Sequence, residues 1–205
     1  MQVRASKRHR SRTKDAVERR TDILTAATQL FREKGITETS IESITEKAGI
    51  AKGTFYLHFE SKDHVVARLW ELYLEGFVSI VRQRLDAVSR QTKWRPLFAD
   101  LLEQLVTHAL DHAELHRTIY RTADAKALDL CREMNGKTMA LIATVIERGV
   151  DAGEFQCPNP ELTTSLVYHG ADGLLHEVIL GSRSMPKAKI VRTIQEFADR
   201  ALRTE

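Results

Sequence analysis

The segment from Ala48 to His64, AGIAKGTFYLHFESKDH, brings positive charge, aromatic rings and glycine close together. A lysine ammonium can neutralise a phosphate, and a small polar side chain suits the edge of a base. A glycine lets the backbone approach another molecule closely. Phe55 and Phe59 are expected to hold a small core instead. The remaining residues have the chemistry of a surface that binds a nucleic acid.

A helix-turn-helix would position these groups. The spacing of apolar residues predicts one helix over about residues 15–34 and a second, short helix capped by Thr39 or Ser40. Gly49 then makes a turn, and a third helix covers about residues 52–58. In a helix-turn-helix the second short helix lies in the major groove of DNA, while the first contacts the backbone.

The sequence GITETSIESITEKAGIAKGTFYLHFESKDHV resembles the DNA-binding domain of the tetracycline-repressor (TetR) family, over roughly residues 17–68. The resemblance implies DNA contacts at the positions that match the family pattern: Thr39, Ser40, Lys52, Gly53, Thr54, Tyr56, His58 and Lys62. Two positions depart from that pattern. Ala51 stands where the family usually has Ser, which leaves the third helix without a side-chain cap. Glu42 stands where the family is often basic or polar, so it would repel phosphate or accept a hydrogen bond from cytosine.

Helical spacing continues through the rest of the chain. A long helix from near Ser61 to about Ser89 predicts a rod of about 42 Å. Five further helices are expected over about residues 94–110, 112–123, 126–151, 160–181 and 186–203. The predicted fold is all-α, with about nine helices. Its predicted parts are a flexible basic arm (1–14), the helix-turn-helix domain (15–61) and a C-terminal bundle (62–205).

The resemblance implies that the C-terminal bundle binds a small-molecule effector and forms a homodimer. Apolar stripes and glycines favour a dimer interface made by Leu166, Gly170, Leu174, Ile190, Ile194, Phe197 and Ala201, although such stripes also suit the core of a monomer. Aromatic and polar residues of the bundle are the candidate ligand contacts: Phe77, Trp94, Phe98, His116, Tyr120, Tyr168, His169, Asp172 and His176. Leu101, Leu105 and Met134 are expected as further walls of that site. The aromatic members equally suit a plain core.

Three histidines raise a metal-binding alternative. His108, His112 and His116 recur every fourth residue and would share one face of an unbroken helix, where imidazoles can bind a metal. Asp111 predicts a helix break between them, which would spoil the shared face. A metal-sensing regulator therefore stays open as an alternative, while no bound metal or cofactor is expected.

The distribution of charge favours a polyanion as partner of the N-terminal end. Residues 1–62 carry 13 Lys or Arg against 8 Asp or Glu, although the net charge of the whole chain is only +3. No apolar run is long enough for a membrane span and no secretory signal is present, so a cytoplasmic protein is expected. Cys131 and Cys157 form no CxxC pair and are expected to be reduced, partly buried thiols. No phosphate loop, nucleophile elbow or zinc-protease motif occurs, which argues against an enzyme.

Together these features predict a sequence-specific transcription regulator. It would be a homodimeric repressor that binds a palindrome-like site in double-stranded DNA and is released when an effector moves the long helix. The alternative from another class is a protein-interaction adaptor that has kept the fold and lost DNA binding. Glu42 and Ala51 leave that alternative open.

Overall fold

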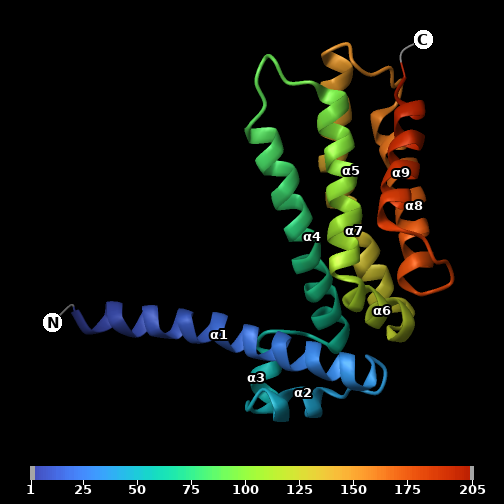
Figure 1. Cartoon of the computed structure of the whole chain (residues 1–205). Helices are drawn as coiled ribbons and strands as arrows, with labels where there is room; N and C mark the ends of the chain where they lie inside the picture. Colours follow the sequence, from blue (N-terminus) through green and yellow to red (C-terminus); the bar gives the residue numbers. More distant parts are fainter. Residues whose placement is uncertain (1–2, 204–205) are drawn as a thin grey trace. The chain divides into compact units, whose positions relative to one another are not determined.

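The computed structural model describes the backbone of residues 3–203 and the side chains of residues 16–203. Within that range the chain forms nine helices and no strand, in the order that Figure 1 labels. The predicted all-α class is therefore confirmed. The chain divides into two compact units: one runs as far as Leu69 and includes Thr118–Leu130, and the other holds Trp70–Arg117 and the chain from Cys131 onward. None of the described helices combines the length and the apolar character needed to cross a membrane.

The first unit begins with a helix-turn-helix, as predicted. Its helices are α1 (Val3–Lys34), α2 (Ile41–Lys47) and α3 (Lys52–Tyr56), with α1 in contact with α2 and α2 in contact with α3. Ser40 caps α2, because its hydroxyl oxygen accepts a hydrogen bond from the amide of Ser43 at 3.1 Å. Gly49 makes the turn with φ of +65°, in the left-handed region that favours glycine.

The helix α1 is longer than predicted. Its backbone is helical from Val3, whereas the sequence predicted a start near residue 15. Residues 3–14 are rich in Arg and Lys and contain neither Pro nor Gly, so their intrinsic preference is compatible with a helix. The side chains of the predicted arm, residues 1–14, lie outside the described residues, and a contact of this arm with DNA stays a prediction.

A small apolar core holds the first unit together. Its buried members are Ile23, Ala27, Phe31, Ile36, Ile44, Phe55, Phe59, Val65 and Val66. The ring centroids of Phe55 and Phe59 are 5.9 Å apart. The guanidinium of Arg20 stands 5.2 Å from the centre of the Phe59 ring. The predicted core role of the two phenylalanines is confirmed by their burial.

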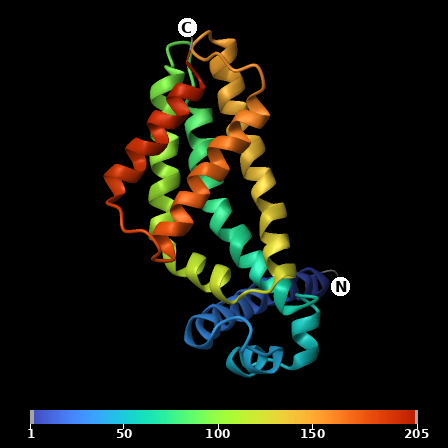
Figure 2. The ribbon, with the colours of Figure 1, turned by 90° about the vertical axis from the view of Figure 1, so that its right-hand side faces the viewer.

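The long helix α4 (Lys62–Asp86) begins in the first unit and continues into the second. Its 25 residues make a rod of about 37 Å, shorter than predicted because the helix ends at Asp86. Five helices follow: α5 (Trp94–Asp111), α6 (Ala113–Thr122), α7 (Ala125–Asp151), α8 (Pro160–Ile179) and α9 (Lys187–Ala201). Their ends lie within two residues of the predicted ones. In the second unit α5, α8 and α9 pack against one another, and Figure 2 shows α8 and α9 side by side.

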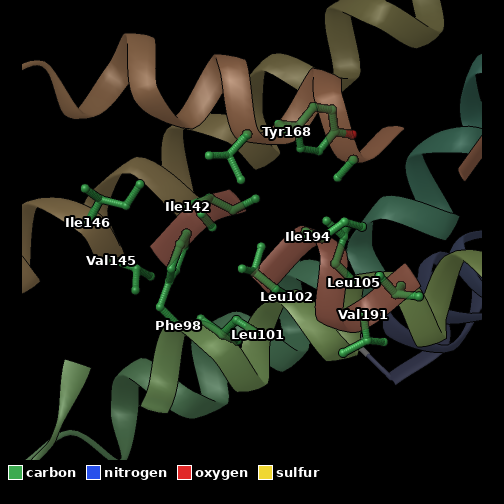
Figure 3. Packing of buried hydrophobic residues seen from close by; sticks show 14 of the residues in the cluster. Phe98, Leu101, Leu102, Leu105, Ile142, Val145, Ile146, Tyr168, Val191 and Ile194 are labelled. Carbon is green, nitrogen blue, oxygen red and sulfur yellow. The ribbon is translucent and has the colours of Figure 1, made fainter. Parts of the chain in front are cut away.

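The second unit has a larger core, built by apolar faces of α4, α5, α7, α8 and α9. Figure 3 shows side chains from α5, α7, α8 and α9 that interdigitate: Phe98, Leu101, Leu102, Leu105, Ile142, Val145, Ile146, Tyr168, Val191 and Ile194. Both cysteines are free and buried, as predicted. Burial raises the pKa of the Cys131 thiol to about 12, which suppresses the reactive thiolate.

Candidate nucleic-acid interface and ligand groove

The outer surface of α2 and α3 carries most of the residues predicted to contact DNA. Six of them are exposed or partly exposed: Ser40, Lys52, Gly53, Thr54, Tyr56 and His58. As predicted, Ala51 provides no side-chain cap for α3, and the amide of Thr54 donates to the Ala51 carbonyl at 2.9 Å instead. The short helix therefore begins with a backbone hydrogen bond alone.

Glu42 and Lys52 meet on this surface. The Lys52 ammonium donates a hydrogen bond to the Glu42 carboxylate, and both side chains are exposed. This hydrogen bond, reinforced by charge attraction, holds the pKa of Glu42 below its ordinary value and raises the pKa of Lys52. The two residues were predicted separately, because no local sequence pattern pairs a residue of α2 with one of α3.

Two residues predicted as DNA contacts hold the loop between α1 and α2. Thr39 is buried, and its hydroxyl donates to the Gly35 carbonyl at 2.7 Å. The Lys62 ammonium donates to three carbonyl oxygens, at 2.6, 3.2 and 2.9 Å, which belong to Ile36, Thr37 and Thr39. Since an ammonium has three N–H donors, Lys62 would have to break these bonds to reach a phosphate. Both side chains therefore have a structural role that the sequence analysis did not predict.

The same loop is tied to α6 within the first unit. The amide of Ile36 donates to the Thr122 hydroxyl at 2.9 Å, and the Thr37 hydroxyl donates to the Thr122 carbonyl at 2.7 Å. A Cβ on Gly35, where φ is +85°, would stand 3.1 Å from a methyl carbon of Thr122. The helix-turn-helix is thus braced by a residue 86 positions beyond Ile36, which no local sequence pattern reveals.

Leu57 is a candidate contact that the sequence analysis missed. It follows α3 directly, and its side chain is 82% exposed. An apolar side chain on this surface suits the methyl group of a thymine. A sequence signal was available, because the positions three and four residues away on either side are all glycine or polar, which is atypical of a core leucine.

In the second unit, three histidines surround Tyr73. The ring centroids of His108, His112 and His116 lie 4.7, 5.5 and 4.8 Å from that of Tyr73. The predicted helix break after Asp111 is confirmed. All three rings still lie around the same tyrosine, on either side of this break.

The imidazoles of this cluster form hydrogen bonds within the protein. Nε2 of His108 donates to the Tyr73 carbonyl at 2.8 Å, and Nδ1 of His112 donates to the His108 carbonyl at 2.8 Å. Among the side chains of residues 16–203, no three His, Cys, Asp or Glu are grouped so that they could hold a metal ion. This geometry gives no support to the metal-sensing alternative.

Three of the predicted ligand contacts, His116, Asp172 and His176, are buried or partly buried polar residues. His116 is only 2% exposed, and burial, with a smaller contribution from the charge of His176, lowers its pKa to about 3. Burial raises the pKa of Asp172, whose carboxylate lies 3.4 Å from Nδ1 of His176. His116 is therefore neutral at physiological pH.

The aromatic residues predicted to line a ligand site are part of the packed core. Phe77, Trp94, Phe98 and Tyr168 are all buried, and Figure 3 labels the last two among the interdigitated side chains. His169 is exposed on α8. Tyr120 belongs to the first unit.

An open groove of about 520 Å³ lies between α4 and α7 in the second unit. This volume is within the range of about 300–1,000 Å³ that is usual for small-molecule sites. Four apolar and four charged side chains line the groove: Leu74, Val78, Met134, Leu141, Glu71, Glu75, Arg82 and Lys137. Met134, an expected wall of the ligand site, lines this groove, and the nine candidate ligand contacts do not. Its residues recur every three or four positions along each helix, but nothing in the sequence shows that these two helix faces meet.

Exposed apolar side chains gather on α8 and α9. Leu162 and Leu166 on α8 are 62% and 70% exposed, and Phe197 on α9 is 52% exposed. Gly170 and Gly173 are also exposed, and a Cβ on either would meet no atom within 4 Å. Large exposed apolar side chains on adjacent helices are typical of a surface that binds another protein chain.

The residues predicted for the dimer interface divide into two groups. Leu166, Gly170, Phe197 and Ala201 are exposed, and Leu174 is partly exposed. Ile190 and Ile194 are instead buried in the core of their own chain. The buried stripe of α9 continues through Ala198 and Leu202, so Phe197 and Ala201 lie beside it rather than on it.

Two segments of the sequence match known families. Residues 23–69 match the bacterial regulatory proteins of the tetR family, and residues 91–191 match the tetracyclin repressor-like C-terminal domain. The transcriptional repressor KstR2 of Rhodococcus jostii is 32% identical over 151 residues, which cover 67% of this chain and 68% of that protein. KstR2 of Mycolicibacterium smegmatis is 29% identical over 156 residues, which cover 73% of this chain and 72% of that protein.

Solved structures show the same fold. A TetR-family transcriptional regulator from Syntrophomonas wolfei matches with a TM-score of 0.78 at 20% identity, over 90% of this chain and 95% of that one. The regulator FadR of Bacillus subtilis, solved in complex with stearoyl-CoA, matches with a TM-score of 0.68 at 14% identity, over 89% of this chain and 99% of that one. At these identities the solved structures show only the fold, whereas the sequence matches show the family. The chain belongs to the TetR family and is a DNA-binding transcriptional regulator.

Proposed function

We propose that the protein is a homodimeric repressor that leaves its operator when a small amphipathic molecule occupies the groove between α4 and α7. The observation that carries this proposal is the groove itself, which has the volume of a ligand site and a lining of apolar and charged side chains. One wall of the groove is α4, the helix that begins at Lys62 in the DNA-binding unit. Such a repressor acts in the cytoplasm and has a regulatory rather than an enzymatic role.

The lining of the groove favours a ligand with an apolar chain and an anionic group. Leu74, Val78 and Met134 offer apolar surface, while Arg82 and Lys137 offer cations. Cationic side chains bind phosphate and carboxylate groups by charge-assisted hydrogen bonds. The related fold of FadR was solved with stearoyl-CoA, which supports a long-chain acyl-CoA as the first probe.

A ligand in the groove is expected to act through α4. The first residue of α4, Lys62, donates to three carbonyl oxygens of the loop that precedes α2. A ligand that binds one arrangement of α4 more tightly than another shifts the population toward the first. A tenfold loss of operator affinity requires about 1.4 kcal/mol of such differential binding.

The homodimer is proposed to form through the exposed apolar side chains of α8 and α9. Leu162, Leu166 and Phe197 are the large apolar groups of that surface, and the exposed glycines of α8 permit close approach of a partner helix. A two-fold dimer presents two copies of α3 to half-sites about one turn of DNA apart. The DNA contacts are proposed for the exposed residues of α2 and α3: Ser40, Lys52, Gly53, Thr54, Tyr56 and His58.

The variant Val78→Trp tests the groove, since an indole at this position fills space between α4 and α7. We expect its affinity for stearoyl-CoA to fall at least about tenfold, the effect of losing a well-filled apolar contact. Its affinity for a DNA fragment from upstream of its own gene should stay within about threefold of the wild type, as a change of that size is less than about 1 kcal/mol. Ser79→Trp is the matched control, because Ser79 is the next residue of α4 and is exposed outside the groove.

Isothermal titration calorimetry measures the ligand affinity, and fluorescence anisotropy measures release of the DNA. Equal binding and equal release for Val78→Trp and the wild type would contradict the groove as the effector site. Failure of the wild type to bind stearoyl-CoA would contradict the acyl-CoA ligand, but not the DNA-binding function.

A further inference from the structure

The side chain of Glu42, on α2, forms a hydrogen bond to α3, the helix expected to lie in the major groove. Glu42 is the second residue of α2, and its carboxylate accepts a hydrogen bond from Lys52, the first residue of α3. A carboxylate beside DNA repels every phosphate alike, and it also reduces the pull of its lysine partner on those phosphates. An acidic group at this place therefore lowers the affinity for DNA of any sequence. It can raise the affinity only through a favourable contact with particular bases.

The chemistry of the pair is complementary to a guanine–cytosine pair. In the major groove, guanine presents the acceptors O6 and N7, and the cytosine next to it presents the N4 amine as a donor. A lysine ammonium donates to guanine, and a glutamate carboxylate accepts from the cytosine amine. A thymine in place of the cytosine presents a carbonyl oxygen, which a carboxylate repels.

We propose that Glu42 and Lys52 act together as a specificity-determining pair, in which Lys52 donates to a guanine and Glu42 accepts from the amine of a cytosine in each half of the operator. The proposal rests on the DNA-binding function of the family. It adds a base-reading role for Glu42, whose departure from the family pattern otherwise only weakens DNA binding.

The surroundings of the pair suit such a role. The hydroxyl of Ser40 caps α2 at the amide of Ser43 and so fixes the helical turn that carries Glu42. Gly53 follows Lys52, and a Cβ at this glycine would meet no atom within 4 Å, so the surface beside the pair is open to a base edge. Because the two side chains already hold each other, little conformational freedom remains to be lost when they meet DNA.

The test uses the full-length protein and the variant Glu42→Gln. A pool of random DNA duplexes is selected by binding and then sequenced, which requires no known operator. We expect the wild type to select a palindrome with a fixed guanine–cytosine pair in each half. In Glu42→Gln the preference for that cytosine should fall by about five- to hundredfold, and adenine should be admitted, because glutamine binds adenine.

Salt dependence gives a second readout. The loss of Glu42 removes a negative charge that offsets Lys52 beside the phosphates, so the slope of log affinity against log salt concentration should steepen by up to about one. Glu46→Gln is the matched control, since Glu46 is an exposed glutamate of the same helix and no contact joins it to Lys52. We expect the control to keep the cytosine preference of the wild type.

Two results would overturn the pairing. Unchanged base preferences in Glu42→Gln would show that Glu42 reads no base. Tighter binding of Glu42→Gln to all sequences alike, without a change in preference, would show that the carboxylate acts only by repelling phosphate. Selection of no common sequence by the wild type would instead contradict sequence-specific DNA binding and, with it, the inference.

Discussion

Gly149→Ala is expected to lower the free energy of unfolding by about 1–3 kcal/mol. A Cβ on Gly149 would lie 2.1 and 2.2 Å from two ring carbons of Phe155, far inside the contact distance of carbon atoms. Phe155 has little room to move. It is buried, its ring centroid is 6.0 Å from that of Phe98, and the guanidinium of Arg95 lies 5.8 Å from its centre. The ring can give way only by losing these contacts.

Gly136→Ala is the matched control on the same helix, α7. A Cβ at Gly136 would meet no atom within 4 Å, and Gly136 lies far from both ends of the helix. Alanine is the better helix former there, so this variant should be more stable than the wild type by up to about 1 kcal/mol. Urea denaturation followed by circular dichroism measures both changes. A Gly149→Ala protein as stable as the wild type would contradict the packing of Phe155 against α7.

Acid is expected to destabilise the protein through His116. Its pKa is about 3 in the folded chain and near the ordinary value of 6.5 in the unfolded chain. Between these pH values the unfolded chain binds a proton that the folded chain does not. The unfolded state is therefore stabilised relative to the folded state as the pH falls. The free energy of unfolding should therefore drop by up to about 1.4 kcal/mol per pH unit below about pH 6.5, down to about pH 3.

Two neighbours of His116 modify this pH dependence. Burial also lowers the pKa of His108, which adds a contribution of the same sign. Burial raises the pKa of Asp172, so the folded chain binds that proton more readily than the unfolded chain, and acid relieves part of the penalty of burying the carboxylate. His116 has the larger effect of the two histidines, because it is the more deeply buried.

His116→Phe removes the titrating group and keeps an aromatic ring beside Trp70 and Tyr73. The free energy of unfolding of this variant, measured in urea from pH 7 to pH 4, should fall less steeply with acid than that of the wild type. His169→Gln, at an exposed position of α8, should keep the slope of the wild type. Identical slopes for His116→Phe and the wild type would show that the burial of His116 does not govern the acid sensitivity.

Local features of the fold were predictable from the sequence, because each depends on a few adjacent residues. Ser40 caps α2, Gly49 makes the left-handed turn and Ala51 offers α3 no side-chain cap, all as the residue types indicated. Apolar spacing located the helices for the same reason. The start of α1 was missed, since a polar and basic segment lacks the apolar period that marks a helix.

Contacts between distant residues were not predictable. The hydroxyl of Thr122 accepts a hydrogen bond from the amide of Ile36, and the carboxylate of Glu42 accepts one from Lys52. Neither contact produces a periodic pattern in the sequence. Lys62 was predicted to contact DNA through its positive charge. In the structure its ammonium donates to backbone carbonyls of the neighbouring loop. A single sequence specifies the type of a side chain more readily than its partner.

The groove between α4 and α7 was not predictable for a related reason. An aromatic side chain such as Phe98 or Tyr168 serves a core and a pocket equally well, and in this protein both are in the core. The groove is lined by mixed faces of α4 and α7 on which apolar Leu74 and Val78 alternate with charged Glu75 and Arg82. Such faces resemble ordinary solvated helix surfaces until the two helices are brought together.

The proposed function is that of a dimeric repressor whose affinity for DNA is controlled by a small molecule. Fluorescence anisotropy of a labelled duplex from upstream of its own gene, titrated with the full-length protein, tests it most directly. We expect two chains per duplex, an affinity that falls steeply as salt rises, and dissociation of the complex on addition of stearoyl-CoA. Binding that is equal for an unrelated duplex and unchanged by stearoyl-CoA would contradict it.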